Sequence, residues 1–515
     1  MNFLMRDSLT ILIFLPLAGV VAMGFTSRKA ERAIRWTSLI FSLAEFAFAL
    51  LLFFKFSPDQ PGMQFPEHIP WITSPLISYH IGVDGLSLLL VLLTAFLTPV
   101  AILASWTSIN DRVKEFFMVL LALECGMIGV FVSLDLFLFF IFWEAMLIPM
   151  YFLIGVWGHG RKVYAAVKFI LYTMVGSALM LVAILYLYHV TGTFDLTVIL
   201  RDFQGGSKAL SGTAQVWLFL AFFLAFAIKV PIFPLHTWLP DAHTEAPTAG
   251  SIILAGVLLK MGTYGLLRFC LPLFPQAARH FAPFISVLAL IGIVYGALVS
   301  MVQPDLKRLV AYSSVAHMGF VVLGIFTLNL IGTEGAIYQM LNHGVSTGAL
   351  FLLVGMLYDR RHTRLIGDFG GLANSIPAFS TFFVIVALSS MGLPLLNGFV
   401  GEFLIILGAF HANAVYGAIA ASGVILAAVY LLWMVQRVFY GNVTDERNRG
   451  LRDCSGRERF LLAVIVAVIV FMGVYPKPFL RRMDWAAQTV VRTVHPSLPP
   501  HALRRAAHHP LEVKR

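Results

Sequence analysis

Apolar residues gather in long segments along the whole sequence, and shorter polar stretches separate them. About fourteen segments of roughly eighteen or more residues could each cross a bilayer as a helix, because a helix rises about 1.5 Å per residue and the hydrocarbon core is about 30 Å thick. The predicted spans are 8–26, 33–55, 84–107, 114–132, 135–156, 163–189, 213–237, 247–270, 278–302, 305–326, 332–358, 375–409, 414–437 and 459–476. The sequence therefore predicts an all-α polytopic membrane protein.

Extended polar segments are few, and they occur only at 56–83, 190–212, 438–458 and 477–515. None of them leaves room for a separate soluble domain, so we expect a single membrane body. Composition agrees with this: 59% of the residues are hydrophobic and 12% are charged. Such a chain cannot present the charged surface of a soluble protein of this size.

Prolines interrupt two of the predicted spans, at Pro231 and Pro234 in one and at Pro394 in the other. In lipid, backbone groups freed by proline need partners in protein or in a water-filled cavity. Each break lies in the fourth span of a block of five, and an odd number of spans inverts the second block. Broken helices at matching positions of inverted blocks point to a translocation site at the midplane. The predicted units are 1–110, a three-helix segment; 111–272 and 273–440, the two inverted blocks; and 441–515, the last span with a basic tail.

Lysine and arginine gather in alternate loops. Since basic loops stay in the cytoplasm, this pattern places the N-terminus outside, and an even number of spans places the C-terminus outside too. The basic tail after Lys477 would then lie on the unexpected side, and one miscounted span would also explain it. The net charge of +10 sits in these loops and not on one face, which favours orientation over nucleic-acid binding.

The three cysteines, Cys125, Cys270 and Cys454, are far apart and form no Cys-x-x-Cys motif. The sequence therefore predicts no iron–sulfur site, zinc site or disulfide framework, and no redox centre in this chain.

Ionisable residues interrupt several apolar spans, and each lysine in a span costs roughly 2.5 to 3.5 kcal/mol on insertion scales. Glu144 follows a run of aromatic residues, and Lys229 ends the span before the first break. We expect the two to pair, because a buried carboxyl stays ionised most easily beside a cation. Lys260, in the next span, is a candidate proton relay. A static ion pair, or a lysine that only joins helices, is the alternative.

Two histidines and one further carboxylate extend this set. His317 and His343 lie in spans among small hydroxyl residues, and histidine can pass a proton through either ring nitrogen. Hydrogen-bonded packing is an equally weighted reading for each histidine. Glu402 follows the second break, where a carboxylate could release a proton or cap the second half-helix.

Other ionisable residues have weaker signals. Glu124 and Lys168 lie in spans, where they could tune Glu144 or Lys229 or pair with neighbours. Asp84 is expected to cap a helix start. His236 and His243, with Asp241 and Glu245, resemble a metal cluster, but their place at the end of a broken span favours helix capping and proton uptake over metal.

Several motifs resemble the antiporter-like subunits of respiratory complex I, an NADH:quinone oxidoreductase. They are Leu239-Pro-Asp-Ala-His-Thr-Glu-Ala-Pro-Thr-Ala-Gly250, Leu258-Leu-Lys-Met-Gly-Thr-Tyr-Gly265, Gly82-Val-Asp-Gly-Leu-Ser87, Phe142-Trp-Glu144, Ala311-Tyr-Ser-Ser-Val-Ala-His-Met-Gly319 and Gly398-Phe-Val-Gly-Glu-Phe403. The match reaches nearly to the end of the last span. Glu402 stands where the L and N subunits and Mrp-type subunits usually carry lysine, and the tail is too short for the lateral helix of subunit L.

This resemblance implies fourteen helices and a row of buried charges along the membrane midplane. It implies roles in proton translocation for Glu144 paired with Lys229, for Lys260, for His317 and His343 and for Glu402. NADH, FMN, iron–sulfur clusters and quinone would belong to partner subunits, and the neighbours would be L- and N-type subunits in a bacterial inner membrane. The alternatives are a subunit of a Mrp-type cation/proton antiporter or of a membrane-bound hydrogenase, and a scaffold with a vestigial channel.

Overall fold

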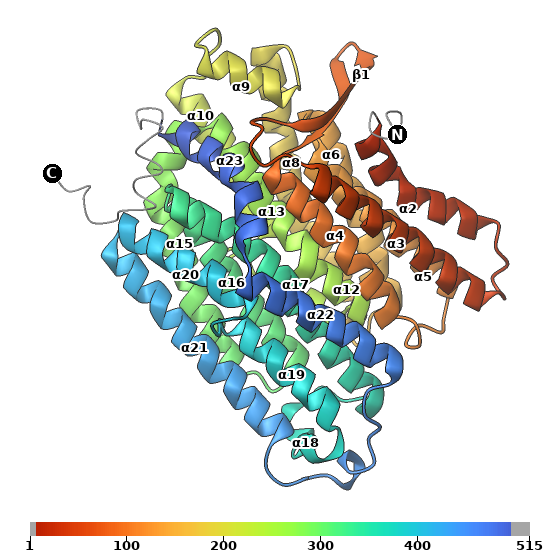
Figure 1. Ribbon diagram of the computed structural model, residues 1–515. Helices are drawn as coiled ribbons and strands as arrows, with labels where there is room; N and C mark the ends of the chain where they lie inside the picture. The colour runs from red at the N-terminus through yellow and green to blue at the C-terminus, as the bar shows by residue number, and fades with distance from the viewer. Residues whose placement is uncertain (1–6, 496–515) are drawn as a thin grey trace.

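The computed structural model describes residues 7–495, and most of them lie in helices that run roughly parallel through one bundle (Figure 1). The elements are α2 (Ser8–Gly24), α3 (Glu31–Lys55), β1 (Gln64–Thr73), β2 (Leu76–Val83), α4 (Gly85–Ala104), α5 (Val113–Val132), α6 (Leu136–Ala145), α7 (Leu147–Trp157), α8 (Lys162–Thr191), α9 (Leu196–Gln204), α10 (Gly212–Lys229), α11 (Trp238–Glu245), α12 (Thr248–Ile253), η1 (Leu254–Leu258), α13 (Leu259–Gly265), η2 (Leu266–Cys270), α14 (Leu271–Leu273), α15 (Pro275–Met301), α16 (Leu306–Phe326), α17 (Leu330–Arg361), η3 (Ile366–Asp368), α18 (Leu372–Ser375), α19 (Pro377–Ser390), α20 (Asn397–Ala412), α21 (Ala414–Phe439), η4 (Glu446–Asn448), α22 (Gly456–Val474) and α23 (Lys477–Val494).

Every predicted span coincides with a helix or a broken helix in this part of the chain. Eleven helices are long and apolar enough to cross a membrane, and a bent pair, α22 with α23, raises the number to twelve. Three shorter apolar helices, α2, α19 and α20, make up the remaining predicted spans. The prediction of an all-α membrane body is confirmed for the bundle.

Both predicted breaks are present. The first separates α10 from α11 at residues 230–237, and the second separates α19 from α20 at residues 391–396. Gly392 and Leu395 adopt positive φ in the second break. A leucine with positive φ is uncommon, because its Cβ crowds the backbone there. The second break is therefore a tight, irregular turn between the two half-helices of one span.

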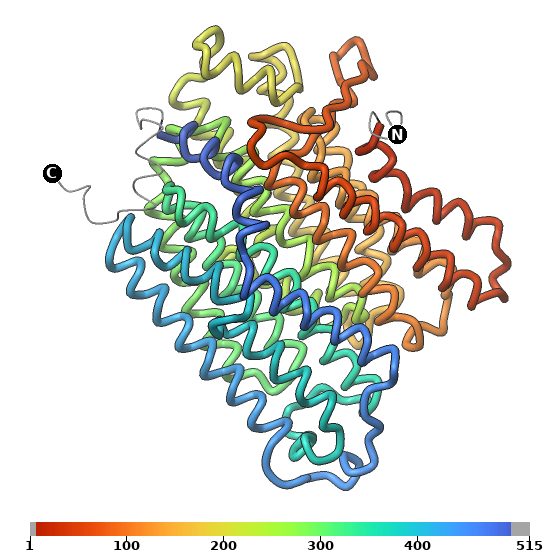
Figure 2. Tube along the Cα trace, in the orientation of Figure 1, coloured from red at the N-terminus to blue at the C-terminus, as the bar shows by residue number. Residues whose placement is uncertain are grey.

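The segments predicted only as polar also contain regular elements, among them β1, β2, α9 and α23. The polar segment 56–83 contains an antiparallel hairpin of β1 and β2, which projects with α9 from one end of the bundle (Figure 1). The predicted tail begins with a helix, α23, which bends by 65° from α22 and packs on α4 and α17 (Figure 2). Residues 496–515 of that tail lie outside the described residues.

Burial separates a central group of helices from the periphery. In the most hydrophobic 18-residue stretch of the α12–α14 span and of α17, every residue is buried. In the corresponding stretch of α3, 39% of the residues are buried. The outer helices carry exposed apolar side chains such as Phe54 and Val182, as a surface against lipid requires. Charged residues on the central helices are therefore enclosed by protein.

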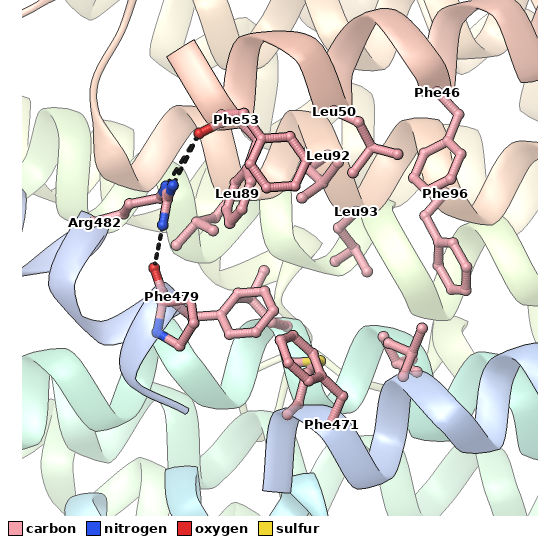
Figure 3. A pocket seen from close by; sticks show the side chains of 16 residues that line it. Phe46, Leu50, Phe53, Leu89, Leu92, Leu93, Phe96, Phe471, Phe479 and Arg482 are labelled. Atoms are coloured by element: carbon pink, nitrogen blue, oxygen red, sulfur yellow. Dashed lines mark hydrogen bonds between the residues drawn. The ribbon is translucent and has the colours of Figure 1, made fainter. Parts of the chain in front are cut away.

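An apolar cavity of about 360 Å³ lies where α23 bends away from α22, between α3, α4 and α17. Arg482 is the charged residue in its wall (Figure 3). Its guanidinium donates to the carbonyl oxygens of Phe53 and Pro478 and stacks 3.8 Å from the Phe53 ring centroid. Arg482 thus ties α23 to the end of α3.

Candidate functional site

Lys260 lies at the centre of the bundle on α13, between the two wide turns η1 and η2. Its side chain is fully buried. Because π-helical turns shift the backbone hydrogen-bond register, carbonyl groups become free to accept from side chains. The Lys260 amine donates to the Ala255 carbonyl in η1 at 2.6 Å and lies 2.6 Å from His343 Nδ1 on α17.

The polar contacts continue from His343 toward Glu402. The ring centroids of His343 and His317 are 5.9 Å apart. On its far side, His317 Nδ1 lies 3.0 Å from Glu402 Oε1. The four residues come from four helices, α13, α17, α16 and α20, and each is at most 4% exposed. The structure therefore brings these four predicted residues together in one row, called here the central row.

Glu402 ends the central row just after the second helix break. Oε1 accepts from Gln339 Nε2 at 3.0 Å, whereas Oε2 has no hydrogen-bond partner in the part of the chain that the structure describes. A Cβ added to Gly392 would lie 2.7 Å from Oε2. The break thus places its backbone directly against the free carboxylate oxygen.

Several polar neighbours of the central row were not singled out from the sequence. Gln339 contacts Glu402, Asn342 donates to Gln339 at 3.0 Å, and the Tyr430 hydroxyl lies 3.4 Å from His317 Nε2. On α17, Gln339 lies one helical turn before both Asn342 and His343, at i+3 and i+4, so this spacing was a usable signal. Tyr430 comes from α21, and only the tertiary structure places it there.

Lys229 and Glu144 lie at the other end of the candidate set. Lys229 is fully buried, 3.7 Å from Met146 Sδ and above the rings of Trp143 and Phe169 at 5.5 and 5.1 Å. No ion pair within 4.0 Å joins Lys229 to Glu144 among the salt bridges of residues 7–495. The sequence predicted such a pair, but the carboxylate is near and not in contact, because Met146 and aromatic rings surround the amine.

Glu144 lies at an edge of the bundle. It is half-buried, and its neighbours Ala145 and Ile148 are exposed. Its Oε1 is buried and has no hydrogen-bond partner among the described residues. A carboxylate at such an edge can respond to a charge that a neighbouring protein brings.

The remaining candidates take other partners. Lys168 donates to Asp241 at 2.7 Å and to the Thr237 carbonyl at 2.9 Å, which ties α8 to α11. His236 packs against Tyr295, with the ring centroids 5.1 Å apart. His243 stacks 4.5 Å from Phe351, and both of its ring nitrogens lack a partner in the described chain.

Two carboxylates near α4 have contrasting surroundings. Asp84 caps α4, as predicted, by accepting from the Ser87 amide at 3.0 Å, and it also pairs with Arg268 at 2.6 Å. Glu124 lies beside a second carboxyl group, that of Glu45 on α3. Glu45 was not singled out from the sequence, although it is a lone acid in an apolar span.

One group of described residues could offer ligands to a metal ion: His68, His80 and Asp195, whose ligand atoms lie within 4.8 Å of one another. It lies on the hairpin and α9, away from the central row. His80 Nδ1 is 2.8 Å from Asp195 Oδ2, and Asp195 also caps α9. Burial would raise the pKa of Asp195, but hydrogen bonds from His80 and Thr197 outweigh it and lower the pKa to about 2. The His80–Asp195 contact therefore joins the hairpin to the start of α9.

Comparison with protein families gives two matches that together cover most of the chain. Residues 133–428 match the model described as NADH:quinone oxidoreductase/Mrp antiporter, and residues 11–129 match that of NADH-ubiquinone oxidoreductase chain 4, amino terminus. NADH-quinone oxidoreductase subunit M of Rhodobacter capsulatus is 47% identical over 505 residues, covering 96% of this chain and 98% of the relative. The chain belongs to the subunit M (chain 4) family of NADH:quinone oxidoreductases. Chain 4 of Marchantia polymorpha is 45% identical to this family member, over 94% of it and 97% of the relative.

Solved structures agree with this family. Respiratory complex I from Thermus thermophilus with bound NADH contains a chain that matches with a TM-score of 0.86 and 32% identity, covering 94% of this chain and 99% of the other. The Mrp complex from Dietzia sp. DQ12-45-1b matches with a TM-score of 0.80 at 20% identity, over 96% and 99%; that likeness concerns the fold alone. The resemblance to the antiporter-like subunits of complex I is confirmed, and the departures from subunits L and N fit subunit M, the counterpart of mitochondrial subunit 4.

Proposed function

We propose that this subunit M family member translocates protons across the membrane through the central row, Lys260–His343–His317–Glu402. The observation that supports this is the continuity of the row: ionisable groups from four helices lie within one or two hydrogen-bond lengths of each other in a buried setting. Intramembrane ionisable residues are costly, and they mark proton relays in pumps and transporters.

The chemistry of the row suits stepwise transfer. A lysine amine can give a proton to a neutral imidazole, and each histidine can accept on one ring nitrogen and donate from the other. Glu402 can then accept the proton through Oε1 and hold it beside the helix break. The gap between the two rings, 5.9 Å between centroids, is closed by a ring rotation or a bridging water.

Lys229 and Glu144 would control the loading of Lys260. A charge that changes near Glu144 alters the field at Lys229, and a buried amine responds strongly because screening inside protein is weak. His243 and His236 would take part in proton uptake, with Lys168 and Glu124 as accessory groups. Electron transfer would occur in partner subunits that hold NADH, FMN, iron–sulfur clusters and quinone.

The arrangement in the membrane is part of this proposal. Residues 111–272 and 273–440 would form two inverted half-channels, flanked by 1–110 and 441–515. The N-terminus would lie outside a bacterial inner membrane, and L- and N-type subunits would be the neighbours. The alternative is a subunit of a Mrp-type antiporter or of a membrane-bound hydrogenase, and Glu402 disfavours the Mrp-type reading because Mrp-type subunits usually carry lysine at that position.

The test removes the amine of Lys260 in the assembled complex. We expect Lys260→Met to lower NADH-driven proton translocation by about 100-fold or more, since a positioned acid or base contributes about 10² to 10⁴ in rate. Proton uptake into proteoliposomes is measured with a pH-sensitive dye. Lys162→Met is the matched control, because Lys162 lies at the start of α8, outside the central row. Its amine donates to the carbonyl of Val156 in α7. Wild-type pumping by Lys260→Met would refute the proposal.

A further inference from the structure

Two carboxyl groups face each other inside the bundle, away from the central row. Glu45 lies on the buried face of α3, Glu124 lies on α5, and both are 0% exposed. The groups are adjacent, and Glu124 is also next to the hydroxyl of Thr98 on α4. Yet none of the four carboxylate oxygens has a hydrogen bond of ordinary geometry in the described chain.

Their depth makes the pair costly. Glu45 is ten residues from the end of α3, and Glu124 is eight residues from the end of α5, which places each roughly 12 to 15 Å from a helix end. None of the salt bridges within residues 7–495 involves either residue. Two adjacent carboxylates in a low-dielectric interior cannot both be ionised, so the pair holds at least one proton.

We propose that Glu45 and Glu124 form a second proton-holding site that exchanges its proton during turnover. This inference rests on the proposed function, because it assigns a further loading site to the same translocation. The carboxyl pair would share one proton in the loaded state and give it up when a charge nearby changes. No atom other than the proton moves between partners.

Polar residues extend from the pair in two directions. On the buried face of α3, Ser42 and Ser38 follow Glu45 at one-turn intervals toward Arg35, and both serines are 0% exposed. That end of α3 carries the basic loop. On the other side, Thr98 and Thr94 lie one turn apart on α4, and α4 packs against η1 and α17, the elements that hold Ala255 and His343.

A structural role alone would leave a different pattern. A carboxyl pair that only joins two helices is most stable when its hydrogen bonds are made, because an unmade bond in a buried group costs about 1 to 3 kcal/mol. Here all four oxygens lack well-formed bonds. The pair also lies where the outer helix α3 meets α5. Only 39% of the residues in the hydrophobic stretch of α3 are buried, so the pair lies between the periphery and the central helices.

The experiment compares Glu45→Gln and Glu124→Gln with Glu115→Gln in the assembled complex. Glu115 is the control, because it lies in the first turn of α5 in an exposed ion pair with Arg28. Infrared difference spectra between the resting and NADH-driven states should contain a carbonyl stretch of a protonated carboxyl that disappears in both Gln variants and persists in the control. Proton translocation should fall about tenfold in each Gln variant.

Three further measurements keep the outcome decisive. Glu45→Asp and Glu124→Asp retain a carboxyl group, so they should keep a shifted band even where a Gln variant fails to assemble. The inference would be overturned if the wild-type difference spectra contained no protonated-carboxyl band that depends on Glu45 and Glu124. Wild-type pumping in both Gln variants would overturn it as well. Lys260→Met is measured in parallel: if it blocks pumping while the Gln variants pump normally, only this inference fails, and if it pumps normally, the proposed function fails.

Discussion

Lys260 shows how single residues in this protein combine burial with reactivity. Its amine has two close acceptors, a backbone carbonyl and an imidazole nitrogen, and none of its contacts among the described residues is a carboxylate. The charged form is therefore held by dipoles and not by a counter-charge. Dipoles in a fixed scaffold stabilise a charge without trapping it as tightly as an ion pair would. This environment suits a proton carrier better than a structural lysine.

Gln339 supplies a prediction at the residue scale. Replacing it with leucine removes one of the two polar contacts of Glu402 Oε1. A hydrogen bond to a charged group contributes about 1.5 to 3 kcal/mol, so we expect Gln339→Leu to lower coupled turnover by about tenfold or more. NADH-driven proton uptake in proteoliposomes measures this. Gln303→Leu is the control, since Gln303 bonds the Val299 carbonyl at the end of α15; equal rates in both variants would contradict the role of Gln339.

At the scale of elements, irregular backbone marks the functional helices. The span from Thr248 to Leu273 alternates between α and π turns, and the spans that hold Lys229 and Glu402 are broken. Elsewhere, small residues let helices approach closely: a Cβ on Gly319 would lie 2.9 Å from the Ala289 carbonyl. Close contact through small residues is the usual way for membrane helices to pack. The rigid helices thus position the irregular ones.

Gly85 gives a prediction for the docking of α23. A Cβ at this position would lie 1.7 Å from the Arg482 carbonyl oxygen, so Gly85→Ala must push α23 away from α4. Overpacking of this kind costs about 1 to 3 kcal/mol. We expect a lower unfolding midpoint and faster hydrogen exchange in residues 477–494. Gly456→Ala is the control, because nothing lies within 4 Å of a Cβ there; unchanged exchange in α23 would show that this contact does not hold the helix.

At the scale of the whole molecule, polar contacts join segments far apart in sequence at the end of the bundle where the hairpin and α9 project (Figure 1). His80 of β2 reaches Asp195 before α9, and the Ser78 amide donates to Asp135 before α6. Arg268 reaches Asp84 at the start of α4. These polar contacts hold the loops outside the spans, while apolar packing and the enclosed charges occupy the centre.

Asp195 gives a pH-dependent prediction for these polar contacts. Its folded pKa is about 2, below the usual value for an aspartate side chain, so its stabilisation is present above about pH 4 and is lost as the pH falls toward 2. The shift corresponds to at most about 2 kcal/mol. We expect Asp195→Asn to lower the unfolding midpoint at pH 5. The unfolding midpoints at pH 5 and pH 3 should also differ less in this variant than in the wild type. Asp202→Asn, on the same helix, should keep the wild-type difference; the same narrowing in both variants would disprove the assignment.

Hydropathy by itself determined where the spans lie along the chain, because crossing a bilayer requires about 20 apolar residues whatever the neighbours are. It also located the two breaks and the buried Lys260, His317, His343 and Glu402, since prolines and charges stand out in such runs. The hairpin of β1 and β2 and the amphipathic α23 lie outside the hydrocarbon segments, where that signal is silent.

Only the tertiary structure decided which of these charges meet. It joined Lys260 to His343 and His317 to Glu402, placed Tyr430 beside the row, and put Glu45 against Glu124. It also left Lys229 among aromatic rings and not in contact with Glu144. The physical reason is that hydropathy fixes the depth of a residue in the membrane, whereas helix rotation and packing fix its direction, and contact between side chains depends on both.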